Sequence, residues 1–146
     1  MKKYELTSET KVINGVKLHR IKALESFGRV EKGELGGWIE SEKNLSQDGD
    51  AWVFDNATVR GNATVRRKED YIVFKNWWSS GRCFTWTRSN NKWKVGCFYG
   101  SGEELIAKAY KDSEKSGREY ERVVKYVNDI LKEEDNDNGN RNKCED

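Results

Sequence analysis

The chain has 146 residues, of which 35% are hydrophobic and 36% are charged, and its formal net charge is +2. A chain of this length can bury about two thirds of its unfolded surface, in one domain or in two tightly joined subdomains. No stretch approaches the roughly 18 consecutive apolar residues of a membrane span, and residues 1–6 lack the apolar core of a secretory signal. The composition therefore predicts a soluble globular protein that makes no membrane contact and stays in the cytoplasm of the cell that makes it.

The first predicted element is a hairpin over residues 11–24. Apolar and polar residues alternate on both sides of Asn14-Gly15, a dipeptide that favours a two-residue turn between antiparallel strands. Gly33, Gly36 and Gly37 then precede Trp38, which indicates a turn-rich segment before the next element.

A six-residue repeat begins at residue 51. Each hexad opens on an alanine and carries a valine two places later, and the first two hexads end on an asparagine where a corner is expected: Ala51, Val53, Asn56, Ala57, Val59, Asn62, Ala63 and Val65. Less regular hexads extend the pattern back to Ile39. Such a repeat is typical of a parallel β-helix, in which each hexad forms one flat side of a coil.

The five hexads make fewer than two coils of such a helix, because roughly three hexads close one coil. Each open end would expose unpaired strand edges and an apolar cross-section. We therefore expect the hairpin over residues 11–24 to close one end, and the rest of the chain or a second copy of it to cap the other. The second possibility predicts a homo-oligomer.

Residues 71–98 predict a small antiparallel sheet. Residues 71–75 form one apolar strand, and a hairpin over residues 82–98 turns at Asn90-Asn91. A two-residue turn there pairs Arg88 with Trp93, Trp86 with Val95 and Phe84 with Cys97. This register gathers Phe84, Trp86, Trp93, Val95 and Cys97 on one apolar face and sends Cys83 to the other, so a disulfide between Cys83 and Cys97 is not expected.

Two amphipathic helices follow this sheet. Ser101 with Glu104, and Ser116 with Glu119, fit the capping box that opens a helix. Apolar residues at helical spacing then give each helix one stripe for burial: Leu105, Ile106, Ala109 and Tyr110 in the first, and Tyr120, Val123, Val124, Val127, Ile130 and Leu131 in the second.

The predicted fold class is therefore α+β: a short parallel β-helix of hexapeptide repeats, followed by a small antiparallel sheet with two C-terminal helices. The predicted domains are residues 1–68 for the N-terminal hairpin and β-helix, and residues 69–132 for the hairpin sheet and two-helix module. Residues 133–146 are acidic and asparagine-rich without apolar anchors, which predicts a disordered tail.

No constellation of catalytic residues is visible in the sequence. The three cysteines are widely spaced and share the chain with one histidine, His19, so no metal-ligand spacing exists, and reduced, structural cysteines are expected. Acidic pairs near residues 48–50 and 55–56 are ordinary turn formers. We expect no catalytic residues, no metal and no cofactor, and the chain is not predicted to be an enzyme.

The segment 66–94 is the predicted binding surface, because it carries eight basic residues against two acidic ones. Large aromatic side chains anchor interfaces and stack on nucleic-acid bases. The candidate binding residues are Lys75, Trp77, Trp78, Arg82, Arg88, Lys92 and Lys94. The alternative is that one tryptophan of the 77–78 pair fills a structural junction and that the basic side chains only solvate the polar face.

Two stretches carry a resemblance to a known family. The repeat region, whose most specific part is GELGGWIESEKNLSQDGDAWVFDNATVRGNATV, resembles small hexapeptide-repeat proteins of phages and prophages of low-GC Gram-positive bacteria. The block FTWTRSNNKWKVGCFYGSGEELIAKAY is similar to a C-terminal ββαα module that recurs in such phage proteins. Many hexapeptide-repeat proteins are acyltransferases, but these place an active histidine between subunits of a long coil, and the coil expected here is short.

The resemblance implies a phage-encoded, non-enzymatic interaction protein. It would act in the host cytoplasm and would bind and inhibit or sequester a host protein or ribonucleoprotein of a defence system such as CRISPR, as an anti-CRISPR or other anti-defence protein. The alternative is a nucleic-acid-binding accessory protein, in which the basic residues contact phosphates and Trp77 or Trp78 stacks on a base. A bound nucleotide is compatible with either interpretation.

Overall fold

The computed structural model describes residues 2–145, and the side chains of residues 2–134. The chain divides into two compact units, Met1–Ser101 and Gly102–Asp146. We call the first the β unit and the second the helical unit, and each is described by itself. The predicted boundary between residues 68 and 69 lies inside the β unit and stays a prediction.

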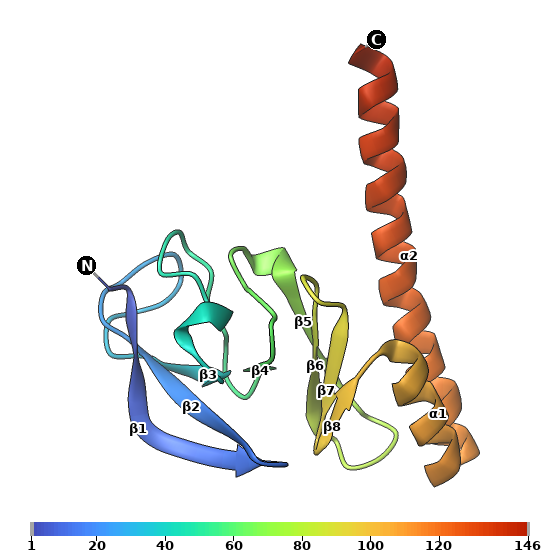
Figure 1. Cartoon of the computed structure of the whole chain (residues 1–146), viewed down its shortest axis with the longest axis horizontal. Helices are drawn as coiled ribbons and strands as arrows, with labels where there is room; N and C mark the ends of the chain where they lie inside the picture. Colours follow the sequence, from blue (N-terminus) through green and yellow to red (C-terminus); the bar gives the residue numbers. More distant parts are fainter. Residues whose placement is uncertain (1, 146) are drawn as a thin grey trace. The chain divides into compact units, whose positions relative to one another are not determined.

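The β unit begins with a hairpin longer than the sequence predicted. Strands β1 (Tyr4–Ile13) and β2 (Val16–Ala23) pair in an antiparallel manner from Tyr4 opposite Ala23 to Ile13 opposite Val16 (Figure 1). Asn14 and Gly15 form the turn with φ of 50° and 79°. Positive φ at both central residues matches the right-handed twist of the flanking strands, as expected for Asn-Gly.

The predicted parallel β-helix is wrong. Strands β3 (Leu35–Ile39) and β4 (Thr58–Val59) complete a four-stranded sheet in the order β1-β2-β3-β4, and only the short β3–β4 pairing is parallel. Most of the hexad residues lie in turns and extended segments outside strands. Hexad residues pair with one another in a parallel manner at Ile39 with Val59 and at Leu45 with Val65, whereas most of the pairing in this sheet comes from the long N-terminal hairpin.

The hexad pattern nevertheless identifies the buried positions. All the alanines and valines of the repeat are at most 4% exposed, and they form one core cluster with the first sheet: Tyr4, Ile21, Ala23, Val30, Ile39, Leu45, Ala51, Trp52, Val53, Ala57, Val59, Ala63 and Val65. Gly37 lies against this cluster so closely that an added Cβ would come within 2.4 Å of the Ala57 carbonyl oxygen. The repeat therefore predicts which side chains point inward, although not how the strands pair.

The second sheet is antiparallel, as predicted, in the order β5-β6-β7-β8. Its strands are β5 (Tyr71–Lys75), β6 (Cys83–Thr87), β7 (Lys92–Val95) and β8 (Phe98–Gly100). Earlier in the chain, the 3₁₀ turn η1 (Glu42–Asn44) lies between β3 and β4, and the 3₁₀ turn η2 (Lys68–Asp70) directly precedes β5.

The predicted register of the second hairpin is wrong by two residues. Trp86 pairs with Trp93, and Thr87 pairs with Lys92, so the turn comprises residues 88–91 rather than two asparagines alone. Only Asn91 of that turn has positive φ. A shift of two keeps every side chain on its predicted face, so Phe84, Trp86 and Trp93 share the apolar face and are at most 2% exposed. Cys97 does not join them, because it lies exposed in the turn before β8.

The helical unit contains α1 (Gly102–Asp112) and α2 (Glu114–Glu145). α2 begins two residues before the predicted capping box, and Ser113 caps it by accepting a hydrogen bond from the Ser116 N–H at 3.1 Å. The ring of Tyr110 packs on Gly117, where an added Cβ would approach it to 2.2 Å.

The apolar stripe of α2 is buried at Tyr120, Val124 and Val127, as predicted. The disordered tail predicted for residues 133–146, and Cys144 with it, falls mostly outside the described side chains and stays a prediction. No helix in the described part of the chain is long and apolar enough to span a membrane.

Candidate functional site

A tyrosine of the second sheet joins that sheet to the repeat segment. The Tyr71 hydroxyl, on β5, donates to the Trp52 carbonyl oxygen at 2.7 Å and accepts from the Phe54 N–H at 3.1 Å. A second link lies further along the junction, where Thr58 of β4 donates its N–H to the Thr85 hydroxyl of β6 at 3.2 Å. The polar face of the second sheet is thus fastened to the repeat segment.

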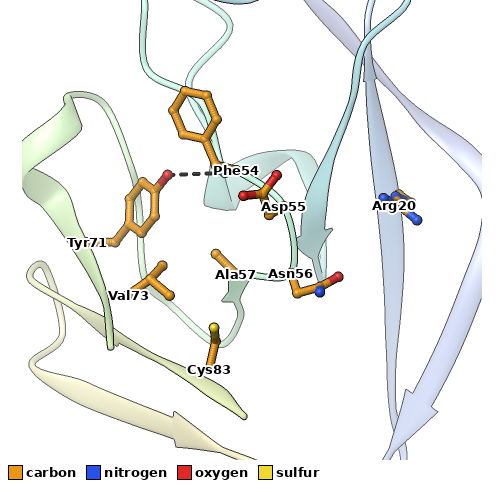
Figure 2. A pocket seen from close by; sticks show the side chains of 8 residues that line it. All are labelled: Arg20, Phe54, Asp55, Asn56, Ala57, Tyr71, Val73 and Cys83. Atoms are coloured by element: carbon orange, nitrogen blue, oxygen red, sulfur yellow. Dashed lines mark hydrogen bonds between the residues drawn. The ribbon is translucent and has the colours of Figure 1, made fainter. Parts of the chain in front are cut away.

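A cavity of about 600 Å³ lies along this junction, within the β unit. Figure 2 shows the turn of residues 54–57 between the β5–β6 side and Arg20 on β2. Asp55 has φ of 46°, a left-handed conformation that asparagine and aspartate tolerate better than most residues. The lining side chains are Arg20, Phe54, Asp55, Asn56, Ala57, Tyr71, Val73 and Cys83.

The walls of the cavity combine apolar surface with opposite charges. Phe54 and Val73 are 44% and 40% exposed, which is unusual for large apolar side chains and leaves them available to a ligand. The Asp55 carboxylate lies on the 54–57 turn, and the Arg20 guanidinium reaches the cavity from β2. The Nε of Arg20 also donates a hydrogen bond to the Gly36 carbonyl oxygen at 3.1 Å. A small molecule with an apolar body and polar ends fits such a site, which also lies within the usual size range of ligand pockets.

Cys83, on β6, brings a thiol to the cavity. It and Cys97 are both free thiols. Burial raises the pKa of the Tyr71 phenol, against the effect of its hydrogen bond with Phe54, so Tyr71 remains a neutral hydrogen-bonding group at ordinary pH. His19 is half-buried on β2, opposite Thr10 and Ile39, and does not line the cavity.

The structure divides the predicted binding surface into parts. Lys75, Trp77, Trp78 and Arg82 lie together at the loop between β5 and β6, where Trp77 is 65% exposed. Trp78 instead packs its ring edge against Phe84 with a centroid distance of 6.3 Å. The loop itself is held by Asn76, whose side-chain oxygen accepts from the Gly81 N–H at 2.7 Å.

The remaining predicted residues lie elsewhere on the second sheet. Arg88 and Lys92 lie at the β6–β7 turn, and Arg88 donates to the Glu69 carbonyl oxygen at 2.8 Å while its guanidinium covers Trp86. Lys94 is only 9% exposed and donates to the Gly96 carbonyl oxygen. The seven residues therefore do not form one continuous surface, and whether any of them binds a partner stays a prediction.

The fold gathers a group of cations that the sequence analysis missed. The Lys11 ammonium lies 4.2 Å from the centroid of the Trp38 ring, and the Arg20 guanidinium lies 5.8 Å from the same ring. The Arg60 guanidinium lies 4.2 Å from the Tyr99 ring, and Tyr99 pairs with Lys94 across β7 and β8. We call Lys11, Arg20, Arg60 and Lys94, with these two rings, the Trp38 cation cluster.

The charges of this cluster act on one another. Burial lowers the pKa of Lys94, and the neighbouring Lys11 ammonium lowers it further. Burial and then Arg20 lower the pKa of Lys11 in the same way. No local pattern could have predicted this, because only the β1–β2 hairpin and the second sheet together bring Lys11 near Lys94. Among the described residues, no group of histidine, cysteine, aspartate and glutamate side chains could hold a metal ion.

Comparison with known proteins finds a relative that is similar to part of the chain. The chain is 35% identical over 74 residues to a protein of Escherichia coli K12 named as the uncharacterized acetyltransferase YdcK. The match covers 44% of this chain and 23% of that protein, so the chain matches less than a quarter of its relative's length. No protein-family model matches the chain.

This similarity bears on two conclusions from the sequence. It overturns the expectation that the chain is not an enzyme, since the relative is named as an acetyltransferase. It also agrees with the hexapeptide-repeat part of the resemblance, because many proteins with that repeat are acyltransferases. It contains nothing on phages or host defence, and that part of the resemblance stays a prediction.

Proposed function

We propose that the cavity between the 54–57 turn and β5 is the substrate site of an acetyl-transfer reaction. The lining of the cavity is the main support for this proposal, because exposed apolar side chains lie there together with Arg20 and Asp55, which are on different walls. The name of the E. coli relative supplies the reaction class. The apolar Val73 and Phe54 would hold the body of the substrate, and the charged groups would orient its ends.

The cavity favours an acceptor that bears an amino group. Asp55 offers a carboxylate to that group, and Arg20 offers a guanidinium to an anionic group at the other end of the molecule. In the transfer step, the neutral amine nitrogen bonds to the carbonyl carbon of an acetyl thioester and the carbon–sulfur bond breaks. The proton lost from nitrogen passes to Asp55 and on to solvent, and the departing thiolate takes up a proton.

An assay of thioester consumption tests this proposal. The full chain would be mixed with acetyl-coenzyme A and a panel of small amines, and the release of free thiol would be followed. We expect at least one amine to be acetylated, and Asp55→Asn to lower the rate by about 10²-fold or more. Glu31→Gln, which removes an exposed carboxylate that is not among the residues lining the cavity, should leave the rate unchanged.

Either of two results would contradict the proposal. One is the absence of thiol release above the uncatalysed rate with every amine tested. The other is release that Asp55→Asn and the cavity-filling variant Val73→Trp leave intact.

A second function is favoured by the exposure of Trp77. A tryptophan that is 65% exposed, next to exposed Lys75 and Arg82, suits single-stranded nucleic acid, whose bases stack on aromatic rings. Binding of a labelled oligonucleotide should then weaken steeply between roughly 50 and 200 mM salt. Binding that is absent, or that Trp77→Ala does not weaken, would exclude this function.

The prediction of a phage-encoded protein that binds and inhibits a host defence component remains a further proposal. It rests on the resemblance of the sequence. Pull-down from host cells with wild-type protein and with Trp77→Ala would test it, because a specific partner should be lost from the variant.

A further inference from the structure

The Trp38 cation cluster holds positive charges together at an electrostatic cost. Lys11 and Arg20 lie beside one tryptophan ring, and Lys94 is buried within reach of the Lys11 and Arg60 charges. Aromatic faces offset part of such repulsion by cation–π attraction, typically about 0.5–2 kcal/mol for each contact. They do not neutralise charge, and a buried ammonium ordinarily has a paired carboxylate.

Carboxylates of the protein do little to balance this charge. Glu9 pairs with Arg20 at 3.4 Å, but within residues 2–134 no carboxylate forms an ion pair with Lys11, Arg60 or Lys94. Glu40, which lies near Tyr99, accepts the Gly61 N–H at 2.9 Å. In the same described part, the buried Nε of Arg60 has no hydrogen-bond partner.

The cluster is also fixed in place. Thr85 pairs with Lys94 across β6 and β7 and accepts the N–H of Thr58, which pairs with Trp38. The turn of the first hairpin is tied to the second sheet, because the Asn14 side chain donates to the Cys97 carbonyl oxygen. Preorganised donors of this kind bind an anion without the cost of assembling the site.

We propose that the Trp38 cation cluster is a binding site for a small phosphate-bearing anion, with a diphosphate group as the best match. A diphosphate supplies several negative charges and several acceptor oxygens, whereas a halide or a single carboxylate would leave most of the cations unbalanced. The buried Lys94 requires a small, compact anion. The site adjoins the cavity through Arg20, but it goes beyond the proposed function, because it binds the anion whether or not acetyl transfer occurs.

Inorganic pyrophosphate is the probe for this site. Calorimetric titration of the full chain, at constant ionic strength and with sodium chloride as the reference salt, should give saturable binding. Lys94→Met should weaken the binding at least tenfold. The same variant, without ligand, should melt at the wild-type temperature or above it, because methionine fills a similar space and removes a buried charge. If Lys94 had a purely structural role, its replacement would not weaken pyrophosphate binding while leaving the melting temperature of the free protein unchanged or higher.

Lys17→Met is the matched control. Lys17 is exposed and lies on the face of β2 opposite to Arg20, so its replacement should leave pyrophosphate affinity unchanged. Lys11→Met provides a second test of the cluster that does not depend on whether Lys94→Met folds. It should also weaken pyrophosphate binding at least tenfold. The proposal is overturned if wild type shows no saturable binding, or if Lys11→Met and Lys17→Met bind equally well. Pyrophosphate binding without acetyl transfer would uphold this site and reject only the proposed function.

Discussion

The Tyr71 hydroxyl donates a hydrogen bond of 2.7 Å to the carbonyl oxygen of Trp52, and this contact joins the second sheet to the repeat segment. The same oxygen accepts the Phe54 N–H, at the start of the turn that lines the cavity. The cavity therefore depends on a bond between β5 of the second sheet and the repeat segment, whose two residues lie 19 positions apart.

Replacing this tyrosine should destabilise the β unit. Tyr71→Phe keeps the ring but leaves the Trp52 carbonyl and the Phe54 N–H without their partner, which costs about 1–3 kcal/mol of unfolding free energy. Urea denaturation would measure the loss. Tyr126→Phe, at a position that is 56% exposed, should change the unfolding free energy by less than about 0.5 kcal/mol. Equal effects of the two variants would show that the Tyr71 bonds do not hold the sheets together.

The hexads give a second stability prediction. Val59 is fully buried in the core cluster, so Val59→Asp places a carboxylate without a partner in an apolar site and should cost several kcal/mol. We expect the variant to be unfolded by circular dichroism at room temperature. Val12→Asp, at a position that is 66% exposed, should remain folded. A folded Val59→Asp would contradict the burial of the hexad valines.

Two features of the β unit show how far the sequence predicts the fold. The turn at Asn14-Gly15 is predicted because its geometry depends on two adjacent residues, and the burial of Val59 is predicted because side-chain direction follows the local repeat. The pairing partner of β4 is not a local property. β4 pairs with β3, which in turn pairs with β2, and the sequence pattern carries no signal that the β1–β2 hairpin continues into this sheet.

The Trp38 cation cluster shows the same limit of prediction from local sequence. Lys94 was predicted to bind a partner on the ground of its charge, but its burial follows from the packing of the second sheet on the first. Lys11 and Arg60 lie outside the basic segment 66–94, and only the tertiary fold brings them to Lys94.

Alkaline pH should destabilise the protein through Tyr4. Burial, and then the Glu42 carboxylate, raise the pKa of the Tyr4 phenol above its usual value of 10.0, and its hydroxyl donates to the Leu45 carbonyl oxygen at 2.6 Å. The folded state thus holds this proton more tightly than the unfolded state, so the stabilisation is complete below pH 10 and falls as the pH rises further. Thermal melting between pH 8 and pH 11 would measure the decline.

The variant Tyr4→Phe isolates this contribution. It should be less stable than wild type at pH 8, because the Leu45 carbonyl loses its partner, and its melting temperature should fall less steeply above pH 10. Tyr71 and Tyr99, whose pKa values burial also raises, retain part of the slope. Parallel curves for wild type and Tyr4→Phe would contradict the assignment.

The two tryptophans of the β5–β6 loop should differ in their effect on stability. Trp77→Ala removes a ring that is 65% exposed and should change the unfolding free energy by less than about 0.5 kcal/mol. Trp78→Ala removes the edge-to-face contact with Phe84 and should cost about 2 kcal/mol or more. Denaturant titration of the two single variants distinguishes an anchor from a core residue at each position. A larger loss from Trp77→Ala would reverse these assignments.

The proposed function requires that an amine occupy the cavity beside β5, so we would titrate the methyl-labelled full chain with each small amine of the thiol-release assay. We expect the nuclear magnetic resonance signals of Val73 and Ala57, which line the cavity, to shift in a saturable manner, and that of Ala109 on α1 to stay in place. Val73→Trp should abolish the shift of Ala57. Signals of Val73 and Ala57 that stay in place with every amine, or that move no more than that of Ala109, would contradict the proposed function.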